Sequence, residues 1–459
     1  MSAIEKEEEI LDQQLEISKD GFEALEKVTK FCCSGCGLCV SICPLGSIEI
    51  DEMLKRPKLV GECNKCGFCY LACPRSFLPL SKIEEAYYGK GTGKEEERVG
   101  KFLDLFVARS LTEEIYKRGT PGGTTTAIVH FLMDRGYVDA ALLTKGKHSD
   151  IEYCMHPEPY IASSPSEVLL SSHSRHVVSP VLSKLRELSE YGNNLFVGTP
   201  CHIMAFRKLQ IINKDNVLRN KMEGVAKIAE KLTAKVKFAI SINCFLNQTN
   251  IDKAYEWLCV QEKDIIKFDE RMCQRDCLRT PFKIDISIIV TKDGQEIPYD
   301  TMESGRLALA SGCLVCPNFI VNKHADVSVG VCAGEPSVED EFKFGWNSVV
   351  VRNPELKEIV DEMISAKKLE KRPLFKGYGR MKRIFLEKFT PTIDVIGVKN
   401  YLENGEWMPI DRSKAKRYRG TGILGVERFF FCQTVKKKMF YEGPVKALRK
   451  AGSYLTTIY

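Results

Sequence analysis

The chain has 459 residues, of which 44% are hydrophobic and 28% are charged, and these fractions are typical of a globular protein and exclude a disordered one. Its length is enough for about three domains. The acidic start, MSAIEKEEEILDQQ, lacks the basic and apolar regions of a secretory signal, and no later window approaches 18 uninterrupted apolar residues. We therefore expect a cytoplasmic protein that does not cross a membrane.

The nineteen cysteines are expected to be metal ligands or redox groups, because a reducing compartment does not favour disulfides. The net charge of +6 is concentrated at the C-terminus, where residues 411–459 hold 12 Lys or Arg and 3 Asp or Glu. This segment is +9, so the rest of the chain is −3. Such a tail suits a solvated helical extension, or docking on a partner or a membrane surface. Nucleic acid is not an expected partner, because no recognition module accompanies the tail.

In chain order, residues 1–30 are predicted to form an acidic helical extension, interrupted at Gly21. Residues 31–80 hold two cysteine runs, and the stretch between them (45–62) reads as strand, turn and strand. The Gly- and Lys-rich residues 87–97 are predicted to be a linker. From about 100 to 395, helical and strand patterns alternate: a helix after Gly123, and buried strands over 137–145 and 194–200. Residues 396–459 are predicted to be a basic, partly helical extension.

The two cysteine runs are nearly identical, since CSGCGLCVSICP recurs as CNKCGFCYLACP. Both have the spacing of bacterial ferredoxins, in which three closely spaced cysteines and a Cys-Pro step surround a 4Fe-4S cube. In two-cluster ferredoxins the fourth cysteine of each run ligates the other cluster. We therefore assign one cluster to Cys33, Cys36, Cys39 and Cys73, and the other to Cys63, Cys66, Cys69 and Cys43.

Zinc and a disulfide knot are the alternatives for these runs, and two interlocked runs with this proline disfavour both. Cys32 is left over and is not expected to bind metal. Two cubes form an electron relay and not a catalyst. We therefore expect a second site, with a flavin or a metal centre, where electrons arrive in pairs and leave singly.

Further cysteines stand in three segments of the body: FVGTPCHIMAF with Cys201, SINCFLNQ with Cys244, and SGCLVCPNF with Cys313 and Cys316. A lone cysteine is more often a small buried hydrophobe than a ligand. One Cys-x-x-Cys pair and two cysteines at strand ends nevertheless supply the number of thiolates that a third cube needs. Cys273, Cys277 or Cys332 would be competing ligands.

Several segments together resemble a known family, the flavin-binding beta subunit of hydrogenases and dehydrogenases that use the deazaflavin coenzyme F₄₂₀. They are TPGGTTTAIVHFLMDRGYVDAAL (120–142), VGTPCHIMAF (197–206), INCFLN (242–247), CLVCPNFIVNKHADVSVGVCAG (313–334) and GWNSVVVRN (345–353). The resemblance implies an α+β multidomain protein: a ferredoxin-like double-cluster module, then a larger α/β body that binds FAD over residues 100–395, then the basic extension.

The resemblance also implies site residues. The FAD phosphates would meet the turn formed by Gly122, Gly123, Thr124 and Thr125, where glycines admit an anion to backbone N–H groups at a helix start. The alternative is an ordinary glycine turn before a helix, without a role in binding. Cys201, Cys244, Cys313 and Cys316 would hold a 4Fe-4S cluster close to the flavin.

Two departures from the family pattern stand out. Where relatives read Thr-Lys-Tyr or Ser-Lys-Tyr, this chain has Ser174, Arg175 and His176, and Arg175 would offer phosphate a forked cation. His202 replaces a glutamine that usually follows the Thr-Pro-Cys element. Arg175 and Arg207 are also candidate cations for the acidic tail of the coenzyme.

The predicted function is that of an oxidoreductase that exchanges a hydride between coenzyme F₄₂₀ and FAD and passes single electrons through three 4Fe-4S clusters. Its partner would be a redox protein or a larger complex that docks at the ferredoxin module or the basic tail. One alternative is that this complex lies at the periphery of a membrane. The alternatives are a ferredoxin-driven reductase of another organic acceptor and a non-catalytic electron-transfer subunit.

Two further motifs carry little weight. Gly420, Gly422 and Gly425 have the spacing of a dinucleotide fingerprint but do not follow a buried strand. The seven histidines form no two-His-one-carboxylate grouping in the sequence, so a mononuclear metal site is not expected.

Overall fold

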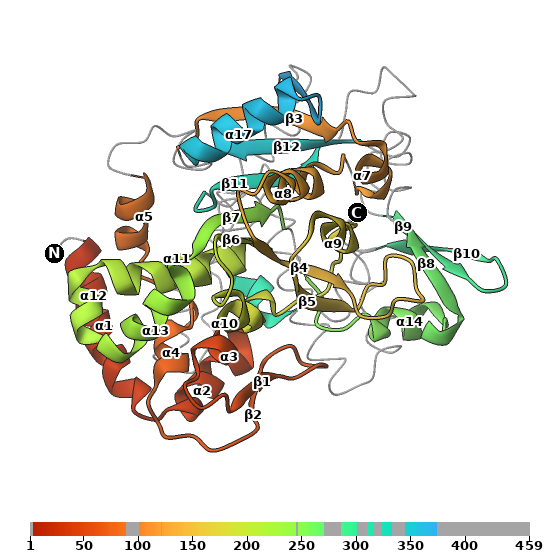
Figure 1. Ribbon diagram of the computed structural model, residues 1–459. Helices are drawn as coiled ribbons and strands as arrows, with labels where there is room; N and C mark the ends of the chain where they lie inside the picture. Colours follow the sequence, from red (N-terminus) through yellow and green to blue (C-terminus); the bar gives the residue numbers. More distant parts are fainter. Residues whose placement is uncertain are drawn as a thin grey trace, which may run out of the picture.

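The computed structural model describes residues 3–88, 101–120, 122–244, 247–269, 286–300, 310–315, 323–332 and 345–373. At its centre is an eight-stranded mixed sheet with the strand order β13-β3-β12-β11-β7-β6-β4-β5 (Figure 1). Its strands are β3 (Asp104–Ser110), β4 (Ala140–Gly146), β5 (Pro157–Ala162), β6 (Asn194–Gly198), β7 (Val236–Ile242), β11 (Val327–Cys332), β12 (Trp346–Val351) and β13 (Leu369–Pro373). The predicted mixed α/β body is thus confirmed.

The four central strands, β4, β6, β7 and β11, run parallel, and antiparallel strands flank them on both sides. The carboxyl ends of neighbouring parallel strands lie at one edge of a sheet, and this is where ligands bind in open α/β sheets. The carboxyl ends of these four strands therefore lie at one edge, which we call the carboxyl edge.

Alternation along the strands builds two cores, one on each face of the sheet. Leu142, Phe196 and Ala239 lie in the core on the face covered by α11 (Pro200–Lys214) and α13 (Glu223–Thr233). Leu195 and Phe238 lie in the other core, together with the apolar faces of α8 (Thr124–Asp134) and α17 (Pro354–Ser365). The helix expected after Gly123 and the two expected buried strands are confirmed as α8, β4 and β6.

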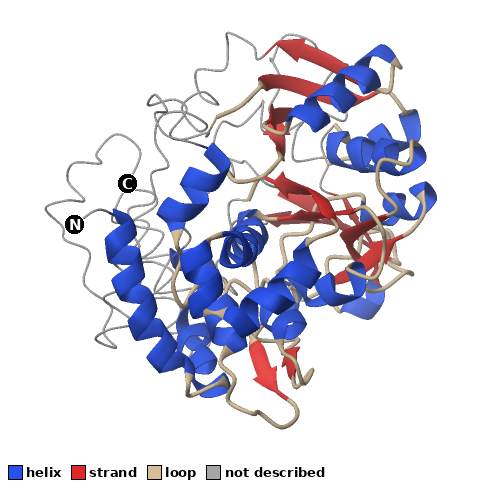
Figure 2. Cartoon of the chain, turned by 60° about the vertical axis from the view of Figure 1, so that its left-hand side comes forward, coloured by secondary structure: helices blue, strands red, loops and turns tan. Residues whose placement is uncertain are grey.

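The cysteine runs and the residues before them form a compact helical module at the lower left of Figure 1. Its elements are α1 (Ala3–Ser18), α2 (Phe22–Cys32), α3 (Leu38–Ile42), β1 (Ile48–Ile50), β2 (Pro57–Leu59), α4 (Phe68–Ala72) and α5 (Leu80–Tyr88). Strands β1 and β2 pair antiparallel, as the strand, turn and strand reading predicts. In Figure 2, where the left-hand side of Figure 1 comes forward, helices surround the strands of the molecule.

The N-terminal helices are not an appendage of the module. Leu11 of α1 and Leu25 of α2 are fully buried in the same core as Leu71 of α4 and Phe206 of α11. The expected acidic extension therefore has an apolar face that the charge count does not show, and this face joins the module to the body.

A second, three-stranded antiparallel sheet lies beside the body, with the order β10-β9-β8. Its strands are β8 (Ile265–Asp269), β9 (Ile286–Thr291) and β10 (Glu296–Asp300). The remaining helices are α7 (Glu113–Arg118), α9 (Pro165–Val168), α10 (Leu185–Leu188), α12 (Asn216–Lys221), α14 (Asp252–Leu258), η1 (Leu169–Ser171), η2 (Val181–Lys184), η3 (Glu262–Asp264) and η4 (Ser311–Val315).

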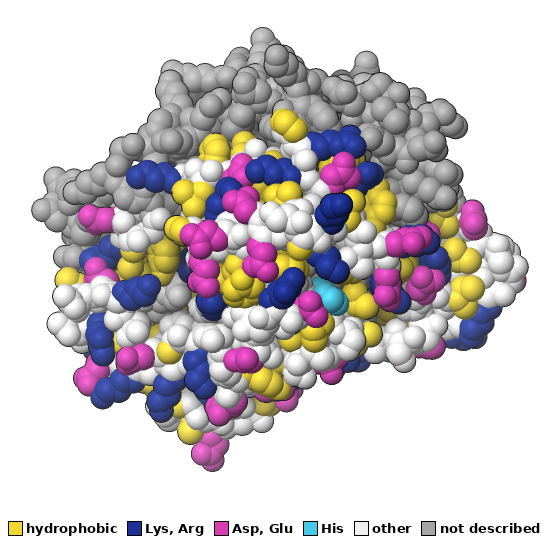
Figure 3. Space-filling view, turned by 45° about the horizontal axis from the view of Figure 1, so that its top comes forward, with side chains coloured by type: hydrophobic (Ala, Val, Ile, Leu, Met, Phe, Trp, Pro, Cys, Tyr) yellow, Lys and Arg dark blue, Asp and Glu magenta, His cyan; other side chains and the backbone are white. Residues whose placement is uncertain are grey.

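On the face of the molecule in Figure 3, Lys and Arg side chains are interspersed with Asp and Glu side chains over the described surface. Among the described residues, no helix has the length and apolar character to cross a bilayer. The predicted linker, apart from its first two residues, and the basic extension with its glycine fingerprint lie outside the described residues.

Candidate functional site

The first set of predicted cluster ligands comes together in the structure. Burial raises the pKa of the Cys39 thiol well above its usual value, and repulsion from Cys36, Cys33 and Cys73 adds to the shift. Burial likewise raises the pKa of Cys36 to about 12, with Cys73 as the next contributor. Cys73, from the other run, is therefore a neighbour of the first three thiols. Cys32 instead donates to the Val28 carbonyl within α2 (3.1 Å).

The second set is gathered in the same way but lies nearer the solvent. Burial raises the pKa of Cys69 to about 12, with further repulsion from Cys66, Cys43 and Cys63. These four cysteines line one hollow in the surface of the module. Cys63 is exposed and Cys66 partly so, whereas Cys43 and Cys69 are buried. The second set thus faces outward.

The first cysteine loop is fastened to the body. The Leu182 amide donates to the Cys36 carbonyl (2.9 Å), and the Gly312 amide donates to the Cys33 carbonyl (2.8 Å). Gly37 has a φ of 84°, and a Cβ there would lie 2.6 Å from the Pro180 carbonyl oxygen. Only glycine permits both this conformation and this approach. The first set therefore lies between the module and the body.

The third group of cysteines is placed by the carboxyl edge. Cys201 follows β6 and Cys244 follows β7, the neighbouring parallel strand. Asn247 links Cys244 to Cys313, because its side-chain Nδ2 lies 3.8 Å from Cys244 Sγ and its backbone N lies 3.4 Å from Cys313 Sγ. Repulsion from Cys201 also contributes to the raised pKa of Cys36. The third group therefore adjoins the first set.

The side chains of the other cysteines considered for this group are not described. Cys316, Cys273 and Cys277 lie outside the described residues. Cys332 ends β11, the next parallel strand along, and its side chain is not described.

His202 reproduces the hydrogen bonds that a glutamine would make. Its Nδ1 accepts from the Thr199 amide (3.0 Å) at the start of α11, and its Nε2 lies 2.9 Å from the Ser179 carbonyl oxygen. Burial lowers the pKa of His202 to about 4. The ring is therefore neutral and carries its proton on Nε2, so it offers one acceptor and one donor, as a carboxamide does.

The predicted phosphate-binding turn also lies at this edge. Gly122 and Gly123 have φ values of 67° and 66°. Thr124 begins α8, where its amide donates to Asn347 Oδ1 (3.1 Å) and its hydroxyl donates to the Ala108 carbonyl (3.1 Å). Asn347 stands near the start of β12 and pairs with Val331 near the end of β11. The turn is thus at the same end of the sheet as the third cysteine group.

Ser174 lies beside this turn, since its hydroxyl donates to the Thr120 carbonyl (3.3 Å). Arg175 Nε donates to the Cys154 carbonyl (2.8 Å), and its Nη1 lies 3.3 Å from the carbonyl oxygens of Ser172 and His173. Thr125, in the first turn of α8, is partly exposed. The described contacts of Arg175 are therefore with backbone carbonyls.

Arg207 is not brought to this edge as a surface cation. Its side chain is buried, Nε donates to the His324 carbonyl (2.8 Å), and Nη2 forms an ion pair with Asp326 (3.1 Å). These described contacts are structural, and the docking role of Arg207 stays a prediction.

A buried cation near the first set has no obvious signal in the sequence. Lys208 is fully buried in α11, and its Nζ donates to the Cys73 carbonyl (2.6 Å) and lies 3.8 Å from the centre of the Phe77 ring. Burial lowers its pKa to about 7. The hint in the sequence is its position on the apolar segment that forms the predominantly buried helix α11, which begins at Pro200.

Two family models that match this chain describe the two parts of one family. Residues 105–186 match the N-terminal part, and residues 191–376 the C-terminal part, of the coenzyme F₄₂₀ hydrogenase/dehydrogenase beta subunit. The chain belongs to this family.

Among its relatives, the coenzyme F₄₂₀-dependent sulfite reductase of Methanocaldococcus jannaschii is 26% identical over 403 residues, which are 86% of this chain and 55% of that protein. The chain thus spans about half the length of this relative. The coenzyme F₄₂₀ hydrogenase subunit beta of Methanosarcina barkeri is 23% identical over 61% of this chain and 85% of its own length. A chain of the F₄₂₀-reducing NiFe hydrogenase complex of Methanosarcina barkeri aligns with a TM-score of 0.48 and 20% identity, over 76% of this chain and 96% of that one.

Proposed function

We propose that this chain is an iron-sulfur flavoprotein that exchanges a hydride between coenzyme F₄₂₀ and FAD and transfers single electrons to or from a protein partner through three 4Fe-4S clusters. The observation that carries this proposal is the succession of cysteine groups. The outward set adjoins the first set within the module, and the first set adjoins the third group at the carboxyl edge, as the effect of Cys201 on the pKa of Cys36 indicates.

Two clusters would be held by the crossed sets: Cys33, Cys36, Cys39 and Cys73, and Cys43, Cys63, Cys66 and Cys69. The thiols of each set fit a cube, because several are buried close enough to raise one another's pKa values. Iron would relieve this repulsion by binding them as thiolates. Arg75, whose Nη2 donates to the Gly312 carbonyl (3.2 Å), and Lys208 would place two cations near Cys73.

The third cluster would be held by Cys201, Cys244, Cys313 and Cys316. Three of these lie where β6, β7 and η4 meet, and Asn247 contacts two of them. Cys316 follows Cys313 by three residues in the chain, as the second cysteine of a Cys-x-x-Cys pair does. Cys332 is the alternative fourth ligand, because it ends the strand beside β7.

The flavin would bind at the turn of Gly122, Gly123, Thr124 and Thr125, with Ser174 beside it and Arg175 in the same segment. FAD supplies the conversion between two-electron and one-electron transfer when bound. The turn fits a phosphate in having two residues without side chains before the start of α8. The Thr124 amide already donates to Asn347, so the remaining N–H groups of the first turn would meet the phosphate.

We propose F₄₂₀ as the coenzyme because members of the family are named for it.

Two observations support a protein partner. Cys63 is exposed at the outward set, and the hydrogenase relatives are named as subunits. Exposed Leu45, Leu59 and Val60 lie close to this set and would form part of the docking surface.

The test is to purify the full chain without oxygen, measure iron and flavin, and add reduced coenzyme F₄₂₀ while recording the absorbance of flavin and clusters. We expect about twelve irons and one FAD per chain, with prompt bleaching. Cys36→Ser and Cys201→Ser should each lose about four irons, whereas Cys32→Ser should lose none.

Other outcomes would contradict parts of the proposal. Bound FAD that responds to reduced ferredoxin but not to F₄₂₀ would indicate a reductase of another organic acceptor. Clusters without FAD would indicate an electron-transfer subunit. Full iron content in Cys201→Ser would exclude the third cluster as assigned.

A further inference from the structure

A group of histidines and carboxylates lies apart from the cysteines, where the body meets the three-stranded sheet. His148 and His156 stand at the two ends of the loop between β4 and β5. Asp252 begins α14, and Glu262 begins η3. No pattern in the sequence predicts a mononuclear site here, because these residues are up to 114 positions apart, but the fold brings them together.

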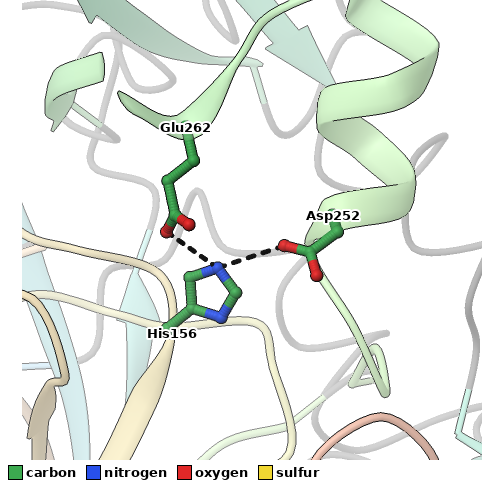
Figure 4. Close-up of side chains that lie close together, drawn as sticks. All are labelled: His156, Asp252 and Glu262. Carbon is green, nitrogen blue, oxygen red and sulfur yellow. Dashed lines mark ion pairs between the residues drawn. The ribbon is translucent and has the colours of Figure 1, made fainter. Parts of the chain in front are cut away.

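The donor atoms converge on one point. Figure 4 shows His156 between the two carboxylates, with Nε2 2.9 Å from Glu262 Oε1 and 3.2 Å from Asp252 Oδ1. The three donor atoms all lie within 4.8 Å of one another. Ligands at right angles around an ion with bonds of about 2.1 Å are about 3 Å apart, and those of a tetrahedral ion are about 3.4 Å apart. The separations of His156 Nε2 from Glu262 Oε1 (2.9 Å) and from Asp252 Oδ1 (3.2 Å) match such a shell.

A simple hydrogen bond does not account for this arrangement. His156 Nε2 and Glu262 Oε1 are both sealed from solvent, and neither has a hydrogen-bond partner of acceptable geometry among the described residues despite their short separation. Burial lowers the pKa of His156, although both carboxylates act in the opposite direction. Neutral imidazole is the form that binds metal ions.

Within the described part of the chain, the two carboxylates have histidines as their ionic partners and pair with no Lys or Arg. Lys147 is 3.0 Å from Glu52, on the β1–β2 hairpin. Lys55, on the same hairpin, faces Asp252, but among the described residues it forms no ion pair with Asp252 or Glu262.

We propose that His156, Asp252 and Glu262, with His148 as a nearby fourth ligand, bind one divalent first-row metal ion of the Zn²⁺ type. His148 Nε2 lies 3.7 Å from Glu262 Oε1, so a modest side-chain rotation completes the set. Imidazole with carboxylate oxygens suits Zn²⁺ or Fe²⁺ rather than Mg²⁺ or Ca²⁺. The side chains are between 21% and 41% exposed, so the ion reaches the site from solvent and water fills open positions.

The proposed ion has a structural role. It joins the β4–β5 loop to α14 and η3, and η3 leads directly into β8 of the three-stranded sheet. The protein itself also ties the loop that carries both histidines, since the Lys147 amide donates to the His156 carbonyl (2.8 Å). This contact holds the two ends of the loop together before the ion arrives.

The test uses the cluster-loaded full chain after dialysis against EDTA, with Zn²⁺ as the probe. Zinc binding is measured by equilibrium dialysis and mass spectrometry in the wild type, Asp252→Asn and Glu262→Gln. Asp264→Asn is the matched control, because it removes one charge from the same η3 helix outside the donor set. We expect the wild type and Asp264→Asn to bind one more zinc per chain than Glu262→Gln. The affinity at that site should fall by at least 10-fold to 100-fold in Glu262→Gln and Asp252→Asn.

A second measurement distinguishes zinc bound at the proposed site from zinc bound by free cysteine thiols. Hydrogen exchange of residues 252–269 should slow on adding zinc to the wild type and not to Glu262→Gln. Equal zinc content and equal exchange in the wild type and Glu262→Gln would overturn the proposal. Loss of iron would show that Glu262→Gln misfolds, and His148→Ala would then replace it. Unchanged zinc affinity in both His148→Ala and Asp252→Asn would also overturn the proposal.

Discussion

Replacing His202 tests whether this histidine acts as a structural stand-in for glutamine. His202→Leu removes the acceptor of the Thr199 amide, which is partly buried, and the donor to the Ser179 carbonyl, which is buried. A buried polar group without a partner costs about 1–3 kcal/mol, so the Ser179 carbonyl should account for about 1–3 kcal/mol and the Thr199 amide for less. His202→Gln restores one acceptor and one donor and should recover most of this loss.

The assay is hydrogen exchange at the start of α11, together with the urea midpoint of the whole chain, because a chain of this size need not unfold in one step. His202→Leu should lose protection at the Thr199 amide, and His202→Gln should keep it. Equal protection in the two variants would refute the assigned hydrogen bonds.

Acid provides a second arm of the same test. The pKa of His202 is lowered by burial to about 4, so between pH 6.5 and 4 the unfolded state binds the proton that the folded state excludes. Stability should therefore fall as the pH falls through this window, by about 3 kcal/mol in all. His202→Gln should lack this part of the pH dependence, and an identical acid profile in both proteins would contradict the assigned protonation state.

Three more predictions follow from other contacts. Gly122→Ala should lower both flavin content and thermal stability, because the new Cβ would lie 2.5 Å from Asn347 Oδ1. Gly136→Ala is the control, because Gly136 has a similar φ of 69° and a Cβ there would meet nothing within 4 Å. It should lose only about 1 kcal/mol of stability, from backbone strain. At about pH 6, below the lowered Lys208 pKa of about 7, Lys208→Met should make one cluster potential more negative by roughly 100 mV in an electron paramagnetic resonance titration. A nearby unit charge contributes about 2 kcal/mol at an effective dielectric constant of about 20, so an unchanged potential at this pH would exclude the electrostatic role. Asn247→Ala should lower iron content at the third group only, and equal loss at all three would indicate general unfolding instead.

Local signals in the sequence predicted much of the fold. The helix after Gly123 and the strands at 137–145 and 194–200 were predictable because turn residues and apolar runs act over a few positions. The N-terminal helices were misjudged, because their many acidic residues hid the apolar face that carries Leu11 and Leu25. Charge counts do not show which face of a helix is buried.

The site was predictable where spacing alone fixes neighbours, as in the cysteine runs. It was not predictable where strand order decides. Asn347 meets Thr124, and His156 meets Asp252, only because of the order of strands and loops in space, which no local pattern contains. The burial of Arg207 was not predictable for a related reason, since its partner Asp326 is 119 positions away.

The core that α1, α2, α4 and α11 share limits how this chain can be divided or recombined. Leu11, Leu25, Leu71 and Phe206 pack in one cluster, so cutting the chain between residues 88 and 101 would leave an uncovered apolar face on both pieces. Neither piece should stay in solution alone. A chimaera between two relatives would then fold only if the cysteine module travels together with the helix surface on which it rests, so recombination should be productive within the body and not at its junction with the module.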